Sequence, residues 1–388
     1  HSYVEWRDQQ KDGFSWVDVD ENDACGLCYT SGTTGNPKGV LYSHRSNMVH
    51  GLIAGMKDAI GFGAADAILP VVPMFHANAW GIAFGAPMAG CKMVFPGMQM
   101  DGASIHELLE TEQCTHAAAV PTVWLMLLQH LQSTGAKIST LKEVLIGGSA
   151  VPEKIVRTFL EDYGVETIHA WGMTEMSPIG TIAQPLPGFE EMSKEDQMAF
   201  RLKQGRTPWG VEMKIVDEAG KTLPRDGKTP GRLLVRGPAV VHRYFRQEDM
   251  DILDDEGYFD TGDMATIDRQ GIMQITDRSK DVIKSGGEWI SSIELENAAV
   301  THPDVAEAAV IGLYHPKWDE RPLLILVASG DTRPSKDDMV AFLSDKVAKW
   351  WLPDDVVYVD EIPHTATGKI SKKDLRDQFK DYSLPTAV

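Results

Sequence analysis

Short apolar runs alternate with amphipathic helical patterns along most of the chain. Strand-like runs occupy residues 24–30, 67–72, 117–120, 144–146 and 167–170. Helical patterns lie between them at 44–59, 104–112 and 122–133. This alternation predicts a large, layered α/β domain with a substantial sheet.

The pattern changes at Gly205. Closely spaced strand-like runs broken by turn residues lie at 212–216, 231–236, 264–267 and 272–276, which predicts a β-rich subdomain over 205–279. Helices at 292–301 and 335–349 and strands at 305–311, 323–328 and 355–359 predict a small C-terminal α+β domain. We therefore expect a large domain over 1–279 and a small one over 280–388. Residues 363–369 combine Pro and Gly and should form an exposed loop.

Length and charge narrow the possible functions. A chain of 388 residues exceeds what one core normally supports. The 37 basic and 56 acidic residues give a net charge of −19, which disfavours nucleic acid and anionic membranes as partners. No apolar run is long enough to predict a membrane span. An anionic ligand must therefore be held by local features.

Cysteine usage suits a reducing, cytoplasmic environment. The four cysteines are too few for a disulfide framework: Cys25, Cys28, Cys91 and Cys114. The C-x-x-C pair lies in a strand-like run without a second pair or a histidine cluster, so structural cysteines are favoured over a zinc site. The chain begins at His1 rather than Met, and we expect it to be the tail of a longer protein.

A segment rich in glycine and hydroxyl residues follows the first strand. Residues 29–39 read Tyr-Thr-Ser-Gly-Thr-Thr-Gly-Asn-Pro-Lys-Gly. Backbone N–H groups, hydroxyls and the Lys38 ammonium suit a phosphate cradle. It is not a Walker A loop, because Pro37 and Gly39 stand where that pattern requires Gly and Ser or Thr. The alternative is a solvated turn between a strand and a helix.

Four further segments carry candidate chemistry. Residues 170–175, Ala-Trp-Gly-Met-Thr-Glu, follow a strand end, where ligands of α/β sheets collect. Trp171 could stack on a base or belong to the core, and Glu175 could serve a cation or a helix N-terminus. Asp263 could accept ribose hydroxyls or cap a turn. Residues 277–290 place five charged residues before a Gly pair, and Gly368-Lys369 lies near the C-terminus.

These motifs, in this order from Tyr29 to Lys369, resemble the adenylate-forming superfamily and, within it, the AMP-forming acyl-CoA synthetases. Residues 75–80 (Phe-His-Ala-Asn-Ala-Trp), 284–290 and 315–322 are similar to the medium- and long-chain fatty acyl-CoA synthetase branch, which includes 3-methylmercaptopropionyl-CoA ligases. Members usually carry a further block before the phosphate loop, so the resemblance implies that the N-terminal part of the large domain is missing here.

The resemblance implies ATP, Mg²⁺ and CoA as cofactors, a homodimer, and a set of site residues. Nucleotide contacts are expected from Thr30, Ser31, Gly32, Thr33, Thr34, Lys38, Gly148, Trp171, Gly172, Met173, Thr174, Asp263, Arg278 and Lys284. Mg²⁺ is expected at Thr30 and Glu175, the acyl pocket at His76, Trp80, Gly147 and Gly148, and the CoA tunnel at Gly286, Gly287, Glu288 and Trp289. Lys369 and His76 are the expected catalytic residues, and the C-terminal lid domain is expected to rotate about Lys280.

The expected activity is ATP-dependent ligation of a short- or medium-chain fatty acid, or 3-methylthiopropionate, to CoA through an acyl-adenylate. One alternative is an amino-acid-activating domain of the same superfamily. The resemblance implies that such a domain would carry an Asp at this position to hold the substrate's ammonium, whereas this chain has His76. A second alternative is a non-catalytic nucleotide-binding relative. The presence of Lys38, Glu175, Asp263, Arg278 and Lys369 argues against it.

Overall fold

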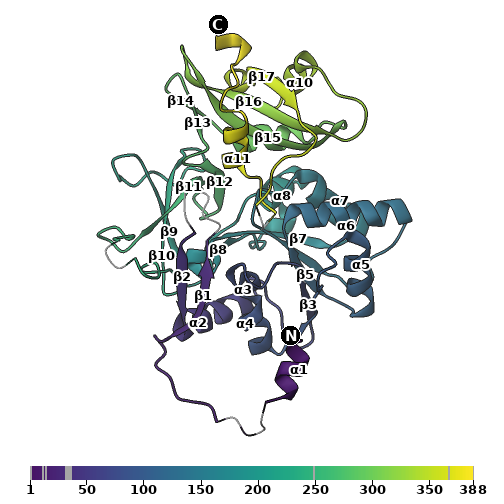
Figure 1. Cartoon of the computed structure of the whole chain (residues 1–388), viewed down its shortest axis with the longest axis vertical. Coiled ribbons are helices and arrows are strands. Elements are labelled where there is room, and N and C mark those ends of the chain that lie inside the picture. Colours follow the sequence, from purple (N-terminus) through teal and green to yellow (C-terminus); the bar gives the residue numbers. More distant parts are fainter. Residues whose placement is uncertain are drawn as a thin grey trace.

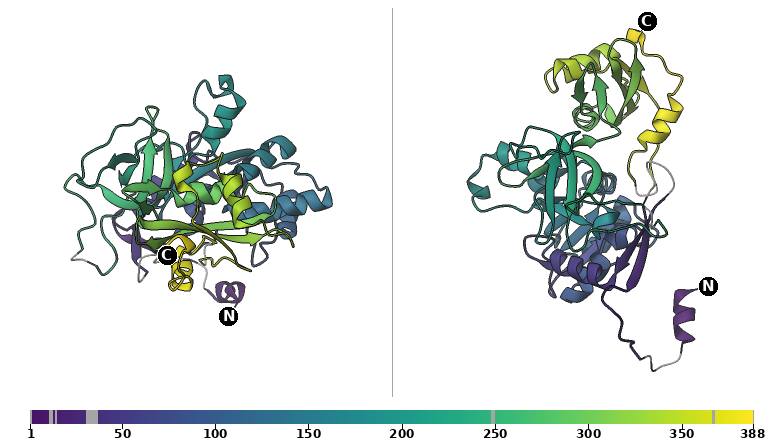
Figure 2. Two further views of the ribbon diagram at one scale, coloured as in Figure 1. Left: turned by 90° about the horizontal axis from the view of Figure 1, so that it is seen from above. Right: turned by 90° about the vertical axis from the view of Figure 1, so that its left-hand side faces the viewer.

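The computed structural model describes residues 2–10, 13, 15–30, 37–247, 250–365 and 368–387. A layered α/β region and a β-rich sheet lie side by side, and a C-terminal region follows them along the long axis (Figure 1). The C-terminal region stands over the other two when the molecule is turned (Figure 2). Helix α1 (Tyr3–Asp8) lies near the opposite end (Figure 1).

A six-stranded sheet forms the centre of the layered region. Its strands are β3 (Ala67–Pro70), β4 (Lys92–Met93), β5 (His116–Ala119), β6 (Glu143–Ile146), β7 (Glu166–Gly172) and β8 (Ile179–Ile182). They are ordered β4-β3-β5-β6-β7-β8, and all neighbours are parallel except β8, which is antiparallel to β7. The carboxyl ends of the parallel strands therefore meet at one edge, where α/β proteins bind ligands.

Helices cover both faces of this sheet. One face packs on α5 (Gly102–Thr111), α6 (Pro121–Thr134) and α7 (Glu153–Tyr163), and the other on α2 (His44–Gly55), α3 (Ala77–Trp80) and α4 (Ile82–Ala89). Successive residues of β6 alternate between the two cores, because strand side chains point to opposite faces: Val144 and Ile146 join the first and Leu145 the second. Burial on both faces explains the uninterrupted apolar runs in the sequence.

The β-rich sheet is antiparallel and has the order β12-β11-β10-β9. Its strands are β9 (Glu212–Val216), β10 (Gly231–Arg236), β11 (Phe259–Ile267) and β12 (Met273–Arg278). The hairpin of β1 (Ala24–Tyr29) and β2 (Gly39–Ser43) packs against its core through Cys28, Val40 and Tyr42. The sheet thereby joins the two ends of the predicted phosphate loop to the strands that carry Asp263 and Arg278.

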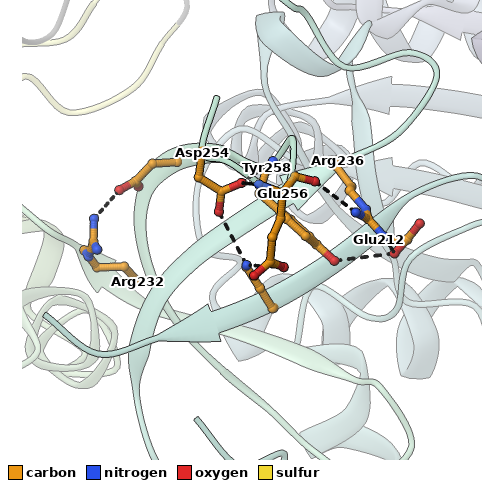
Figure 3. A network of polar contacts seen from close by, with 8 residues as sticks. Glu212, Arg232, Arg236, Asp254, Glu256 and Tyr258 are labelled. Atoms are coloured by element: carbon orange, nitrogen blue, oxygen red, sulfur yellow. Dashed lines mark hydrogen bonds and ion pairs between the residues drawn. The ribbon is translucent and has the colours of Figure 1, made fainter. Parts of the chain in front are cut away.

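A polar network on this sheet secures the turn before β11 (Figure 3). The cations of Lys214 and Arg236 both lie over the Tyr258 ring, at 4.2 and 4.6 Å from its centroid. Lys214 also pairs with Asp254 and Glu256 at 3.4 and 3.0 Å. These contacts tie the segment before β11 to β9 and β10.

The C-terminal region has its own sheet and two apolar cores. Its strands are β13 (Ile283–Ser285), β14 (Glu288–Ile290), β15 (Val305–His315), β16 (Asp319–Ala328) and β17 (Asp355–Tyr358), and its helices are α9 (Ser292–Ala299), α10 (Lys336–Leu343) and α11 (Lys372–Gln378). The remaining elements are α8 (Lys194–Arg201) and 3₁₀ turns at Thr174–Met176, Phe189–Glu191, Lys349–Trp351 and Pro385–Ala387. Among the described residues, no helix has both the length and the apolar character needed to cross a bilayer.

The predicted α/β architecture is confirmed, with local differences. The phosphate loop is followed by a strand, β2, before the helix, because residues 39–43 pair with β1. The helix predicted over 335–349 ends at Leu343. The predicted boundary at Lys280 lies between the last strand of the β-rich sheet and the first strand of the next sheet, and it stays a prediction.

Candidate active site

A cavity of about 550 Å³ lies at the carboxyl ends of β6 and β7, where the three regions meet. Most of the predicted site residues line it, although they come from segments far apart in the chain. They are Thr30, Lys38, His76, Trp80, Gly147, Gly148, Trp171, Gly172, Met173, Thr174, Glu175, Asp263, Arg278, Lys280 and Lys369. Predicted residues Ser31, Gly32, Thr33 and Thr34 lie outside the described residues.

Trp171, Asp263 and Arg278 form one connected group. The Trp171 indole Nε1 donates to Asp263 Oδ2 at 2.9 Å, and Arg278 Nε lies 3.4 Å from Asp263 Oδ1. Asp263 pairs with Arg278 across β11 and β12, and it is only 5% exposed. Burial raises the pKa of Asp263, while Arg278 and the indole N–H oppose that shift. The pair thus presents a restrained carboxylate beside an aromatic face.

Glu175 is held by a tyrosine that the sequence analysis did not identify. Tyr244 donates its hydroxyl to Glu175 Oε1 at 2.7 Å, and Lys38 Nζ lies 4.7 Å from the centroid of the same ring. The Thr30 and Lys38 backbones are joined by an N–H···O bond of 2.9 Å, and Lys38 N donates to Thr30 Oγ1 at 3.1 Å. The two ends of the predicted phosphate loop are therefore fixed beside Glu175.

Lys369 enters the cavity from the C-terminal region. Its Cε lies 3.5 Å from the position that a Cβ on Gly148 would take, and Gly148 has a φ of +87°. A larger residue there would be strained and would crowd the lysine. Burial, with Arg278 nearby, lowers the pKa of Lys369 to about 8, although Asp263 and Glu175 favour its charge. Lys369 is half-buried, so the prediction of an exposed loop over 363–369 does not hold for it, whereas His364 in the same segment is exposed.

His76 and Trp80 flank a left-handed turn at the apolar end of the cavity. Residues Ala77 to Trp80 have φ values of 46°, 54°, 51° and 58°, which L-residues adopt only at an energetic cost. The Trp80 ring is 8% exposed and reaches to within 3.2 Å of where a Gly147 Cβ would lie. Burial and Lys369 lower the pKa of His76 to about 4, so its imidazole is neutral at neutral pH.

Five predicted residues lie away from the cavity. Lys284, Gly286, Gly287 and Glu288 are exposed on or between β13 and β14, and Trp289 lies on β14. Their predicted contacts with nucleotide or CoA would require a different placement of the C-terminal region. Those roles stay predictions.

The oxygen atoms of Glu175 and Thr30 fit a magnesium ion whose other ligands come from a bound phosphate and from water. Within the described part of the chain, no group of three or more His, Cys, Asp and Glu side chains could hold a metal alone. Glu175 and Thr30 offer hard oxygen atoms in the cavity. Mg²⁺ is typically held by one or two carboxylates together with phosphate oxygens and water, and the carboxylate of Glu175 matches that pattern.

Two family models match the chain. The model of the AMP-binding enzyme family matches residues 3–245, and the model of the AMP-binding enzyme C-terminal domain matches residues 294–369. The chain therefore belongs to the AMP-binding enzyme family.

Named relatives lie within this family. The chain is 53% identical to the 3-methylmercaptopropionyl-CoA ligase of Ruegeria lacuscaerulensis over 368 residues, which is 95% of this chain and 68% of that ligase. It is 49% identical to the medium-chain-fatty-acid–CoA ligase of Ectopseudomonas oleovorans, over 99% of this chain and 70% of the relative. ATP-bound MatB from Rhodopseudomonas palustris superposes with a TM-score of 0.84 at 26% identity, covering 97% of this chain and 72% of MatB.

Replacing Trp171 by Phe should weaken AMP binding about ten-fold, equivalent to about 1.4 kcal/mol, because the aromatic face is kept while the N–H that restrains Asp263 is lost. Isothermal titration with AMP measures the change. Trp209→Phe, at a residue 68% exposed and outside the cavity lining, is the matched control. Equal affinities in both variants would contradict a role for this hydrogen bond.

Proposed function

We propose that this chain is an AMP-forming acyl-CoA ligase that joins a short- or medium-chain fatty acid, or 3-methylthiopropionate, to CoA through an acyl-adenylate. One observation carries the proposal. Lys38, Arg278 and Lys369 converge on one cavity of an otherwise acidic chain. The ammonium of Lys369 comes from the C-terminal region and lies beside the phosphate loop. This arrangement suits a reaction at a phosphate in which the ammonium is later withdrawn, so that a second substrate can reach the site.

In the first half-reaction, a carboxylate oxygen attacks the α-phosphorus of ATP and pyrophosphate leaves. Trp171 stacks on adenine, with Gly172 and Met173 beside it, and Asp263 accepts the ribose hydroxyls. Thr174 and Lys369 hold the α-phosphate, where negative charge grows in the transition state. Mg²⁺, held by Glu175 and Thr30, would offset charge on the phosphates.

The loop beginning at Thr30 binds the terminal phosphates. Ser31, Gly32, Thr33 and Thr34 supply hydroxyl and backbone N–H donors, and Lys38 supplies charge. The hydrogen bonds between Thr30 and Lys38 support this assignment, because they close the loop's two ends beside Glu175.

The acid occupies the apolar end of the cavity. Trp80 packs in the core beneath the sheet edge and closes this end, which favours short and medium chains. Gly147 and Gly148 form the adjacent wall, and the neutral His76 imidazole can donate a hydrogen bond to the carboxylate. Position 76 carries His rather than Asp, so no carboxylate there could pair with a substrate ammonium, and an amino acid is disfavoured.

In the second half-reaction, the CoA thiolate attacks the adenylate carbonyl and AMP leaves. Lys369 and a pantetheine chain cannot occupy the same side of the site. The domain of residues 280–388 therefore rotates about Lys280, withdrawing Lys369 and bringing Lys284 and the CoA tunnel of Gly286, Gly287, Glu288 and Trp289 to the cavity. A homodimer and a cytoplasmic location complete the proposal, supported by the family resemblance and the cysteine usage.

A panel of acids tests the function. With ATP, Mg²⁺ and CoA, we expect butyrate, hexanoate, octanoate and 3-methylthiopropionate to give thioester, AMP and pyrophosphate with higher kcat/KM than hexadecanoate, because Trp80 limits the pocket. Coupled pyrophosphate release and chromatography of the thioester measure the products. AMP binding without pyrophosphate release from any acid would favour a non-catalytic relative.

Lys369→Ala should slow acyl-adenylate formation about 10²- to 10³-fold, or about 3 to 4 kcal/mol, because the transition state loses its mobile positive charge. Rapid-quench assays of acyl-AMP measure this step. Conversion of supplied acyl-AMP and CoA should persist. Lys373→Ala, at an exposed neighbour, is the control. Equal losses in both half-reactions would contradict the division of labour.

The adenylation half-reaction should lose kcat/KM as pH rises through about 8. The pKa of Lys369 is lowered to about 8, so its charged form dominates below that pH and disappears above it. Pyrophosphate release without CoA avoids titration of the thiol. Lys369→Arg should move this alkaline limb upward, because guanidinium stays charged. An unchanged limb in Lys369→Arg would assign the titration to another group.

A further inference from the structure

A buried charged cluster joins the strand before Lys280 to two helices after it. Asp277, the next-to-last residue of β12, accepts hydrogen bonds from the Ser292 backbone N–H at 2.6 Å and from Ser292 Oγ at 2.8 and 3.0 Å. Lys372 Nζ donates to Ser292 Oγ and pairs with Glu296 Oε1 at 2.8 Å. The Ser291 hydroxyl adds a hydrogen bond to the Thr276 carbonyl.

The cluster connects the nucleotide cavity with the segment that carries Lys369. Ser292 and Glu296 belong to α9, and Lys372 begins α11 three residues after Lys369. Asp277 belongs to the β-rich sheet and precedes Arg278, whose side chain reaches the cavity. Because neighbouring strand residues point to opposite faces, β12 presents Arg278 to the ligand and Asp277 to the C-terminal region.

Burial makes these contacts costly to separate. Asp277 is 1% exposed, and the Lys372 side chain is 11% exposed. Burial works against the charge of Lys372, yet its pKa is raised, because Glu296 and Asp277 lie beside it. A buried carboxylate that loses its donors is strongly unfavourable unless water or another partner replaces them. The cluster therefore favours the arrangement in which it is closed.

A second ion pair provides an internal contrast. Arg376 Nη2 on α11 lies 2.8 Å from Asp281 Oδ1, just after Lys280. Both of these residues follow Lys280 and would move together in a rotation there. Asp277 precedes Lys280, so the same rotation separates it from Ser292 and Lys372.

We propose that Asp277 is a positioning residue that latches α9 and α11 across Lys280 and so holds Lys369 in the cavity for adenylation. Opening this latch accompanies the rotation that admits CoA. The inference rests on the proposed function for its catalytic consequence, but the latch itself is a property of the free protein. Asp277 acts through Ser292 and Lys372 and does not touch the reacting atoms.

The latch is tested first without catalysis. Native protein and Asp277→Asn are treated with a trace of acetic anhydride, and acetylation of Lys369 is quantified by peptide mass spectrometry relative to exposed Lys154. Lys369 should react about five- to ten-fold faster in Asp277→Asn, because the segment that carries it is released. Asp281→Asn removes only the pair behind Lys280 and should leave the ratio unchanged. Equal labelling in native protein and Asp277→Asn would overturn the latch.

The half-reactions then test its consequence. Asp277→Asn should slow acyl-AMP formation about ten-fold and leave the conversion of supplied acyl-AMP and CoA unchanged or faster. An equal loss of rate in the two half-reactions would indicate a merely structural role and overturn the assignment. If Asp277→Asn does not fold, Ser292→Ala removes the bridging hydroxyl and keeps the Lys372–Glu296 pair. Absence of pyrophosphate release in native protein would contradict the proposed function. The acetylation of Lys369 would still show whether Asp277 holds the C-terminal region in place.

Discussion

Opposing electrostatic effects meet at the ammonium group of Lys369 in the cavity. Burial and Arg278 both disfavour the Lys369 cation, whereas Asp263 and Glu175 favour it. The result is a Lys369 pKa of about 8, so the ammonium is charged at neutral pH and loses its proton just above it. Gly148 provides the space, because a side chain there would meet the lysine.

The same balance explains why an acidic chain can bind an anionic ligand. The net charge of −19 repels phosphate at long range, but local fields in a low-dielectric cavity outweigh distant, screened charges. Tyr244 restrains Glu175, and the Trp171 indole restrains Asp263. The carboxylates are thus fixed as acceptors beside the cations.

Two neighbouring residues of β12 face the cavity and the C-terminal region respectively. Arg278 faces the cavity, and Asp277 joins the buried cluster with Ser292 and Lys372. A shift of β12 would therefore move Arg278 in the cavity and Asp277 in the buried cluster together. The C-terminal region stands over the rest of the molecule in Figures 1 and 2, and the contacts of Asp277 and Lys372 with Ser292 tie β12 to it.

The sequence by itself determined the strand and helix rhythm, the acidic charge, the phosphate-loop composition and the order of the motifs, because these depend on neighbouring residues. It did not reveal β2, the left-handed turn before Gly81, or the inward course of Lys369. Only the tertiary structure joined Trp171 to Asp263 and Asp277 to Ser292 and Lys372. Such contacts link segments distant in the chain, and packing and burial decide them, which no local pattern encodes.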